Sequence, residues 1–572
     1  MLNLLVAKMP IASWTEKIVD WMTANWAGFF DAIQHGGQGT MDLANAMLGA
    51  VPPLMMIVIM TIFAVLVSHK KWGFPLFVFL GLLLVWNQGL WADLVQTTTL
   101  VILSSLLAIV IGIPLGIWMA KSDNVAKVLQ PLLDFMQTMP GFVYLIPAVA
   151  FFGIGAVPGV FASLIFSLPP TVRFTNLGIR QVPVEMEEAA DSFGSTPKQK
   201  LFKVELPLAK STIMAGVNQT IMLALSMVVL ASMVGAPGLG QGILSAVQHA
   251  AVGAGFVNGI ALVILAITID RFTQRLNVDA VEAQQQKSKW RKWVGWLTAL
   301  VLAGSMVGGL FAQQAAAKKS VSLVYVQWDS EIASTNVLAQ AFKEKGYQVK
   351  MTPLDNAVMW QTVANGQADG SVSAWLPNTH QAQYKKYHKN LDMLGANMRG
   401  AKVGLVVPDY MNVDSIADLQ SQADKTITGI EPGAGVMAAA DKALKAYPNL
   451  SDWKLQGSST GSMAVALDKA IKSHDDIVVT GWSPHWMWKK YQLKYLADPK
   501  NTMGQAETIN TMARKGLKAD KPEVYRALDN FHWQKGDMES VMLDIQNGMS
   551  PEKAAQKWVD AHPKQVNAWF EK

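Results

Sequence analysis

The sequence predicts a multi-domain chain in which an all-α membrane domain precedes an α/β domain. Hydrophobic residues make up 51% of the 572 residues, yet the long apolar runs are confined to the first 311. From residue 320 onward, strand-like runs alternate with helical stretches, which is the pattern of an α/β domain. We therefore expect four parts: an amphipathic segment at 1–45, a membrane domain at 46–280, a linker with an anchor helix at 281–319, and a domain outside the membrane at 320–572.

Two features of the composition exclude whole classes of chemistry. The chain has no cysteine, so disulfides, thiolate metal sites and cysteine nucleophiles are ruled out. Its net charge is only +6, and lysines and arginines that flank membrane spans account for it more simply than nucleic-acid binding does. We expect no nucleic-acid partner and no metal site.

Residues 1–35 are too polar to span a bilayer, yet they show helical periodicity. Apolar and charged side chains fall on different faces: Trp14, Ile18, Trp21, Met22 and Phe29 on one, and Glu16, Lys17 and Asp20 on the other. This pattern predicts a helix that lies in the membrane interface. A helix packed against the membrane bundle is an equal alternative.

Seven apolar segments follow, and most are long enough to cross a bilayer. They lie at 50–68, 73–91, 98–120, 140–153, 160–173, 212–234 and 254–270. The connections rich in lysine and arginine fall on one side if the seven spans alternate, which makes that side cytoplasmic by the positive-inside rule. The polar insert at 188–207 is on this cytoplasmic side.

An eighth apolar segment, at 293–311, follows the basic run KSKWRKW and precedes AQQAAAKK. A basic start, an apolar middle and small residues afterwards are typical of a secretory signal, so cleavage after 315–317 is one alternative. Because the segment lies in the middle of the chain, we favour a retained anchor. Such an anchor delivers residues 320–572 to the outside of the cell.

The polar insert EAADSFGSTPKQKLFKVELP, from Glu188 to Pro207, reads as two short helices with a sharp joint. Gly194 suits the left-handed residue that ends a helix. Thr196 is a suitable N-cap, and Pro197 follows it at the first helical position. The insert is therefore predicted to be an ordered, solvent-exposed helical hairpin.

The order Glu-Ala-Ala, three residues, Gly, nine residues, Val-x-Leu-Pro resembles the EAA loop of permease subunits of ABC importers. In that family the loop is the cytoplasmic helix that docks into the ATPase subunit. The resemblance implies a role in ATPase coupling for five residues: Glu188, Ala189, Ala190, Gly194 and Pro207.

Three tryptophans follow predicted strands in the C-terminal part: Trp328, Trp375 and Trp482. In open α/β sheets, ligands bind beyond the carboxyl ends of strands. A single tryptophan there is more often a packing residue, but several indole faces around one point favour a quaternary ammonium group. The predicted strands are Val321–Gln327, Gln348–Thr352, Gly370–Ala374, Val403–Val407, Thr426–Ile430, Ile477–Thr480 and Leu493–Leu496.

A fourth strand end leads into EPGAGV, Glu431 to Val436, before a helical run. Backbone N–H groups at a helix start form a carboxylate site, although an ordinary glycine-rich turn is the alternative. His380, five residues after Trp375, can donate a further hydrogen bond to an anion. Together these features describe a zwitterion with a methylated cation and a carboxylate.

The segments AWLPNTH (374–380), TGIEPGAGVM (428–437) and TGWSPHWMW (480–488) resemble the glycine betaine and proline betaine binding proteins of ABC importers. In that family three tryptophans form a prism around the ammonium head, and backbone amides and a histidine hold the carboxylate. The resemblance implies six ligand-binding residues: Trp328, Trp375, Trp482, His380, Gly435 and Val436.

Across both halves the chain resembles the fused permease and binding subunit of OpuA-type glycine betaine importers. This implies a type I ABC importer transmembrane domain followed by a two-lobed, type II periplasmic-binding-protein-like domain in the cell membrane. It also implies osmoprotection, a second copy of this chain, two ATPase subunits that carry ATP and Mg²⁺, and no catalytic residue or cofactor here. The chain has no G-x-x-x-x-G-K-[ST] and no H-E-x-x-H, in keeping with that expectation.

Three alternatives remain open at this stage. One is a membrane-anchored receptor that senses a quaternary amine without transport, which the EAA loop disfavours. Another is an ABC importer for choline or carnitine. A sugar or peptide importer is the weakest, because the aromatic cage opposes it.

Overall fold

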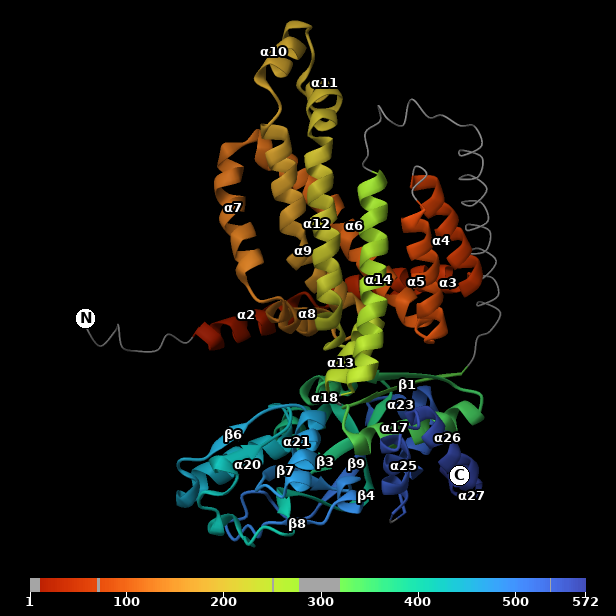
Figure 1. Ribbon diagram of the computed structural model, residues 1–572, viewed down its shortest axis with the longest axis vertical. Helices are drawn as coiled ribbons and strands as arrows, with labels where there is room; N and C mark the ends of the chain where they lie inside the picture. Colours follow the sequence, from red (N-terminus) through yellow and green to blue (C-terminus); the bar gives the residue numbers. More distant parts are fainter. Residues whose placement is uncertain (1–10, 69–71, 249–250, 277–318, 535, 572) are drawn as a thin grey trace, which may run out of the picture. The chain divides into compact units, whose positions relative to one another are not determined.

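The computed structural model describes residues 11–68, 72–248, 251–276, 319–534 and 536–571. They divide into two compact units, a helical unit built before residue 276 and a sheet-containing unit built after residue 319 (Figure 1). The all-α and α/β halves predicted from the sequence are therefore confirmed. The predicted anchor at 293–311 lies outside the described residues, and the proposed boundary at 45 falls inside a continuous helix, Ala27–Gly49.

The helical unit consists of α-helices joined by short turns. They are α2 (Ile11–Asn25), α3 (Ala27–Gly49), α4 (Pro53–Val67), α5 (Gly73–Asn87), α6 (Trp91–Lys121), α7 (Asp123–Thr138), α8 (Leu145–Phe152), α9 (Ala156–Arg180), α10 (Val184–Ser192), α11 (Pro197–Lys200), α12 (Leu206–Ser232), α13 (Leu239–Gln248) and α14 (Val252–Leu276).

Among the described residues, four helices are long and apolar enough to cross a membrane: Trp91–Lys121, Ala156–Arg180, Pro197–Ser232 and Val252–Arg275. Two bent pairs, α3 with α4 at 88° and α7 with Gly141–Phe152 at 105°, raise the number to at most six. The segment predicted to span at 140–153 is too short by itself, because Pro140 and Gly153 limit it to a short 3₁₀ turn and the eight-residue helix α8. It is the second part of the bent pair that begins with α7, so that pair is the candidate span.

The predicted amphipathic helix at the start of the chain is present as α2. Ile11, Trp14, Ile18 and Trp21 are all more than half exposed in the monomer. Phe30, early in α3, instead packs against Phe152 and Val157. The apolar face of α2 is open, as expected of a helix in the membrane interface. The start of α3 is packed against other helices, as expected from the alternative.

Small residues set the helix spacing in the centre of the unit. A side chain at Gly116 of α6 would place its Cβ 2.5 Å from Thr175 Cβ and 2.6 Å from the Val172 carbonyl oxygen, both on α9. Gly112, one turn earlier, meets Thr171 in the same way. Such close approach is typical of membrane helices, in which van der Waals packing replaces the hydrophobic driving force.

The sheet-containing unit has two lobes that share one long strand. The sheet order is β2-β1-β3-β9-β4-β7-β5-β6, with β8 also paired to β4. The first part of β4 (Leu391–Pro408) pairs with β9 in the first lobe, and its last part pairs with β7 and β8 in the second. The strands are β1 (Ser320–Tyr325), β2 (Gln348–Pro353), β3 (Gly370–Leu376), β5 (Thr426–Thr428), β6 (Lys454–Gln456), β7 (Val478–Ser483), β8 (Leu493–Tyr495) and β9 (Glu507–Arg514).

All seven predicted strands exist, with shifted ends. The sequence analysis missed β6, β9 and the first half of β4, because the last of these carries Gly395, Gly400 and several polar residues. Helices complete both lobes: α17 (Asp329–Glu344), α18 (Asn356–Ala364), α19 (Gln381–Tyr387), α20 (Gly435–Ala446), α21 (Thr460–Ser473), α22 (Met487–Lys490), α23 (Leu517–Asp520), α24 (Pro522–Asn530), α25 (Asp537–Gln546), α26 (Pro551–Ala561) and α27 (Pro563–Phe570).

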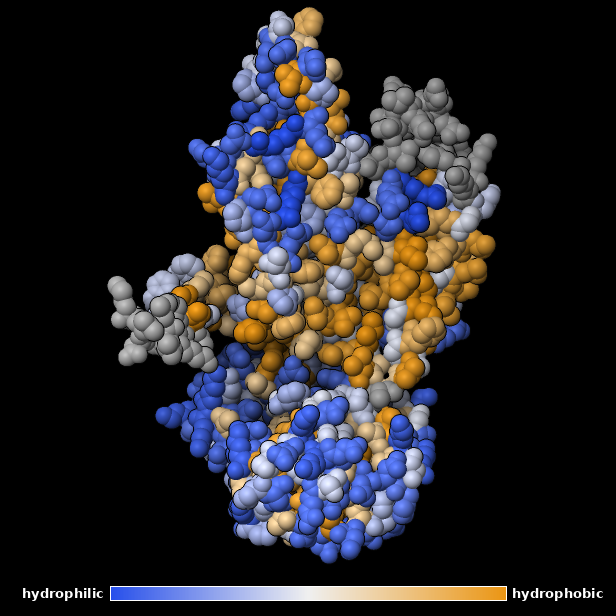
Figure 2. Space-filling model, turned by 60° about the vertical axis from the view of Figure 1, so that its left-hand side comes forward, coloured by the Kyte–Doolittle hydropathy of each residue, from blue (hydrophilic) through white to orange (hydrophobic). Residues whose placement is uncertain are grey.

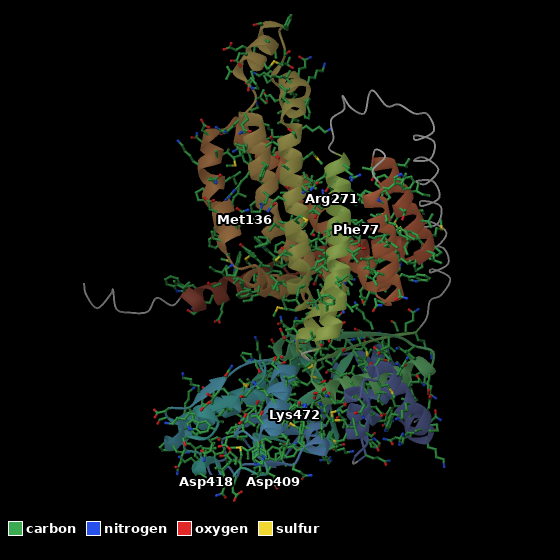
Figure 3. The ribbon with its side chains drawn as sticks, viewed as in Figure 1. Phe77, Met136, Arg271, Asp409, Asp418 and Lys472 are labelled. Atoms are coloured by element: carbon green, nitrogen blue, oxygen red, sulfur yellow. The ribbon has the colours of Figure 1, made fainter. Side chains whose placement is uncertain are left out.

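The surfaces of the two units differ in polarity. Figure 2 shows apolar residues gathered around the middle of the helical unit, whereas its end at α10 and α11 is hydrophilic. The surface of the sheet-containing unit is mostly hydrophilic. Polar side chains such as Asp409, Asp418 and Lys472 lie on the second lobe (Figure 3). An apolar belt on one unit and a polar coat on the other match a membrane domain and a domain in water.

The packing of α6 on α9 leads to a stability prediction. Gly116→Ala should destabilise the helical unit by about 1–3 kcal/mol, because the new methyl group overlaps backbone and side-chain atoms of α9. The matched control is Gly259→Ala in α14, where a Cβ meets nothing within 4 Å. Thermal unfolding of the detergent-purified chains measures both. Equal melting temperatures for the two variants would contradict the predicted contact.

Candidate functional site: a tryptophan-lined cavity and a coupling loop

A small cavity between the two lobes of the sheet-containing unit brings together most of the predicted ligand residues. The empty space between its lining atoms is about 290 Å³, which suits a small molecule rather than an oligopeptide. None of the lining side chains is ionisable. They are Trp328, Trp375, Thr379, Val403, Ile430, Ala434, Gly435, Val436 and Trp482.

The three tryptophans reach the cavity from three different strand ends. Trp328 is the N-cap of α17 and comes three residues after β1, which ends at Tyr325 rather than at the predicted Gln327. Trp375 and Trp482 are instead the second-to-last residues of β3 and β7, so the prediction that they follow their strands is off by two residues. All three are buried. Three indoles around an uncharged cavity provide faces for a cation that needs no hydrogen-bond acceptor.

A polar neighbour holds one of these indoles in place. The Trp375 Nε1–H donates to Glu331 Oε1 at 2.6 Å. Since a buried indole N–H usually finds a partner, this bond decides which way the Trp375 ring faces. Near Trp482 the bond is to the backbone instead, because the Trp482 carbonyl accepts from Trp488 Nε1 at 2.8 Å.

The other end of the cavity is formed by the first turn of α20. Gly435 and Val436 are the first helical residues, and Ala434 is the N-cap. Among the described residues, no acceptor is hydrogen-bonded to the N–H of Gly435 or Val436. Two free N–H groups at the positive end of a 12-residue helix form a site for a carboxylate.

Gly435 also allows the two lobes to meet. A Cβ at this position would lie 2.3 Å from the Thr379 carbonyl oxygen, which belongs to the loop after β3. Glu507 holds that loop, because its Oε1 accepts the Thr379 N–H at 2.9 Å and the Asn378 N–H at 3.2 Å. The glycine is therefore required by close backbone approach across the cleft.

His380 is the one predicted ligand residue that does not line the cavity. It lies directly beside it, with its ring centre 5.8 Å from that of Trp328, and it is fully buried. Its Nδ1 accepts from the Trp375 backbone N–H at 3.1 Å and from Trp360 Nε1 at 3.4 Å. Nε2 therefore carries the proton of the neutral ring, and this N–H has no partner among the described residues.

Burial lowers the pKa of His380 to about 3. The ring is thus a neutral donor at physiological pH, and it can complete the anion site next to the backbone amides. The sequence analysis missed Thr379, Val403, Ile430 and Ala434 in the lining. Their apolar or small side chains carry no chemical signal, and only the closure of the lobes brings them to the cavity.

The second predicted site is the loop that resembles an EAA loop. Glu188, Ala189 and Ala190 lie on α10, and Ala190 is buried. Gly194 has φ +75° while a Cβ would meet nothing within 4 Å, so the backbone conformation alone requires glycine there. Thr196 caps α11 in a reciprocal capping box with Gln199, as predicted in outline.

The second helix of this loop differs from the prediction. It is not a separate short element, because α11 continues through the π-helical turn Leu201–Glu205 directly into α12, whose first turn contains Pro207. Lys200 Nζ bridges back to Asp191 at 2.9 Å and so ties α11 to α10. The loop is therefore joined to one continuous helix that runs from Pro197 to Ser232. At the joint, the Phe193 side chain is 90% exposed.

One short motif in the second lobe fits a different chemistry in sequence but not in structure. Residues 457–461 read GSSTG, which matches the G-x-S-x-G pattern of a nucleophile elbow. Ser459 is the N-cap of α21, and its Oγ accepts from the Ser462 N–H at 3.1 Å. Within the described part of the chain, no imidazole is hydrogen-bonded to it. The serine is a helix cap rather than an activated nucleophile.

Comparison with known families agrees with this division. Residues 112–279 match the family described as binding-protein-dependent transport system inner membrane component. Residues 319–561 match the substrate binding domain of ABC-type glycine betaine transport systems.

Individual relatives agree with the family matches. Among them, the glycine betaine/carnitine transport permease protein GbuB of Listeria monocytogenes is 58% identical over 277 residues, or 48% of this chain and 98% of that protein. The glycine betaine transport system permease protein OpuAB of Bacillus subtilis is 49% identical over 271 residues, or 47% of this chain and 95% of that protein. The crystal structure of lactococcal OpuAC complexed with glycine betaine is 67% identical, covers 44% of this chain and all of that chain, and has a TM-score of 0.44.

Fold, site and comparisons define a multi-pass membrane permease of a binding-protein-dependent ABC transport system. The chain belongs, more particularly, to the glycine betaine permease family and carries an OpuAC-type substrate-binding domain on the same polypeptide.

The environment of His380 predicts its titration. The pKa of His380 is about 3 in the folded state and near 6.5 in the unfolded state. As the pH falls, the unfolded state therefore binds the proton first. For this reason His380 lowers the stability of the fold as the pH falls below about 6.5. The ring itself should stay neutral, with the proton on Nε2, down to about pH 5. NMR of ¹⁵N-labelled histidine, assigned with His380→Gln, measures this. A midpoint near 6.5 for His380 would contradict the buried tautomer.

Proposed function

We propose that this chain is the permease and substrate-binding subunit of an ATP-driven importer for glycine betaine. The observation that carries the proposal is a single cavity with three indoles at one end and two free helix N–H groups at the other. Glycine betaine has a quaternary ammonium and a carboxylate one methylene apart, which fits these two ends. Each desolvated cation–π contact is worth about 2 kcal/mol or more.

The anion end favours a betaine over choline, which has a hydroxyl in place of the carboxylate and leaves the dipole of α20 without its counter-charge. Carnitine has a longer chain between its two charges, so it matches the short spacing between the indoles and the first turn of α20 less well than glycine betaine does. Proline betaine keeps the short spacing and remains a second substrate of this proposal. Uptake of such solutes serves osmoprotection.

In this proposal, separate ATPase subunits supply the energy for the transport cycle. Two copies of the chain would pair, and each EAA-type loop would dock on one of two separate ATPase subunits, which bind ATP and Mg²⁺. The chain would contribute no catalytic residue. In the cell membrane, the loop at α10 and α11 would face the cytoplasm and residues 320–572 would face outward, in line with the basic connections between the apolar segments.

A receptor without transport is the candidate from a different class. It would need the cavity but not the α10–α11 loop. Copurification of the full chain with an ATPase, followed by uptake of radiolabelled glycine betaine into proteoliposomes with ATP inside, separates the two. Binding without any ATP-dependent uptake would favour the receptor.

Calorimetry with a panel of ligands tests the substrate assignment. The purified chain should bind glycine betaine more tightly than choline or carnitine, because only glycine betaine satisfies both ends of the cavity at the short spacing. No heat with any quaternary amine would overturn the proposal.

Removing one indole should weaken binding severely. Trp375→Ala or Trp482→Ala should each raise the Kd for glycine betaine more than tenfold, since a lost cation–π contact of about 2 kcal/mol exceeds the 1.4 kcal/mol per decade. Trp453→Ala is the matched control, because Trp453 is buried in the same unit but does not line the cavity. Parent-like binding by both cage variants would make the indoles packing residues.

Two neighbouring glycines separate lobe closure from loop flexibility. Gly435→Ala should weaken binding at least tenfold, because its Cβ would overlap the Thr379 carbonyl and keep the lobes apart. Gly433→Ala, two residues earlier, should bind like the parent because a Cβ there meets nothing within 4 Å. Calorimetry measures both, and equal affinities would contradict the role of close approach.

The joint of the loop predicts a coupling defect without a binding defect. Gly194→Val should retain glycine betaine binding but lose betaine-stimulated ATPase activity and uptake, because a β-branched residue resists φ +75° and so re-aims α10 relative to α11. Gly194→Asn should keep part of the coupling, because asparagine tolerates this region. The reconstituted complex measures both activities; normal uptake by Gly194→Val would exclude this loop as the coupling element.

A further inference from the structure

Glu331 is a buried carboxylate directly behind the cavity, and no comparison or motif assigns it a role. It lies in the first turn of α17, three residues after Trp328, and its side chain is fully covered. Oε1 accepts from Trp375 Nε1 at 2.6 Å, and Oε2 accepts from Ser330 Oγ at 2.5 Å. One carboxylate therefore joins the elements that present two of the three indoles.

This carboxylate lacks a cation of its own. Within the described residues, no lysine, arginine or histidine forms an ion pair with Glu331. A buried negative charge is expensive unless it is paired, and the first turn of α17 and two hydrogen bonds meet only part of that cost. By contrast, the buried Asp369 in the same unit has both Arg514 and Lys521 as partners.

The charged groups around Glu331 do not supply the missing positive charge. Asp329 is an acid, and its Oδ2 lies 3.0 Å from His485 Nε2. His485 contacts Asp329 and the Met487 N–H rather than Glu331. His380, on the other side of Trp375, is neutral. Trp375, whose Nε1–H Glu331 accepts, lines the tryptophan-lined cavity, so a cation bound in that cavity would lie close to Glu331.

We propose that Glu331 is a positioning and specificity-determining residue for the ligand. Its hydrogen bond fixes the Trp375 indole, and its charge makes the cavity select a permanent cation over a neutral group of the same shape. The bound ammonium then acts as the counter-ion of Glu331, with the Trp375 indole between the two charges. This inference rests on the proposed function, because it needs a quaternary ammonium in the cage.

The protonation behaviour of Glu331 fits this arrangement. Burial raises the pKa of Glu331 to about 7, although the hydrogen bonds from Ser330 and Trp375 favour the charged form. A cation in the cavity favours the ionised form by Coulomb attraction. No fixed partner among the described residues neutralises the charge of Glu331, so a cation bound in the cavity can shift Glu331 toward its ionised form.

A ligand pair that differs only in charge tests the proposal. Glycine betaine and 3,3-dimethylbutanoate have the same shape, but a carbon atom replaces the quaternary nitrogen in the latter. Calorimetry on the purified full chain at about pH 8, above the pKa of Glu331, gives the ratio of their dissociation constants. Glu331→Gln keeps an acceptor for Trp375 Nε1 and removes the charge, so we expect roughly tenfold weaker binding of glycine betaine and no weaker binding of the isostere.

The controls separate charge from structure. Asp369→Asn removes another buried carboxylate, and it should leave the ratio of the two dissociation constants unchanged. Ser330→Ala retains Glu331 but removes a hydrogen bond to the charged form; it should lower the affinity for glycine betaine alone at about pH 7, and it decides the matter if Glu331→Gln does not fold. Equal losses for both ligands, or no loss for either, would overturn the proposal. If the parent chain does not bind glycine betaine at all, the proposed function fails instead.

Discussion

The cavity depends on one backbone contact between the lobes, the approach of Gly435 on α20 to the Thr379 carbonyl after β3. On one side of this contact lie the free N–H groups of Gly435 and Val436. On the other lie Trp375, near the end of β3, and His380, which follows the loop that Glu507 holds through the backbone of Asn378 and Thr379. A side chain at residue 435 would separate the aromatic end of the site from its anion end. Cation and carboxylate recognition are thus one geometric event, because both ends form only when the lobes meet.

Several buried polar groups around the cavity have no partner among the described residues, and the proposed ligand would supply one for each. The His380 Nε2–H and the first N–H groups of α20 have no acceptor in this part of the chain, and Glu331 has no cationic partner there. An unpaired buried donor or charge normally costs stability. A zwitterion satisfies both kinds of group at once, whereas an apolar molecule of the same size satisfies neither. Specificity here follows from unmet hydrogen bonds and charge rather than from shape alone.

The helical unit is held together by close helix packing and by one ion pair at the base of its loop. Gly112 and Gly116 let α6 approach α9 closely. The fully buried Glu205 in the π-helical turn pairs with Lys121 at the end of α6, at 2.5 Å. This pair links the base of the α10–α11 loop to the α6–α9 core. Because Glu205 is fully buried whereas Lys121 is 42% exposed, loss of Lys121 would leave a buried carboxylate unpaired, which costs more than the pair itself is worth.

Local chemistry in the sequence determined a large part of this protein. The left-handed Gly194, the Thr196 cap, and the division into a membrane part and a sheet-containing part follow from short-range rules about glycine, capping and apolar runs. Strand ends indicated the tryptophans, and the family resemblance implied the full set of six ligand residues, five of which line the cavity. Tertiary structure alone decided the rest. The segment 140–153 is the short second part of a bent pair with α7 rather than a span by itself. Strand β9 lies between β3 and β4 only because distant parts of the chain pair there. The Glu331–Trp375 bond joins residues 44 positions apart. Such contacts depend on how the two lobes fold against each other, and no local pattern of residues encodes that distance.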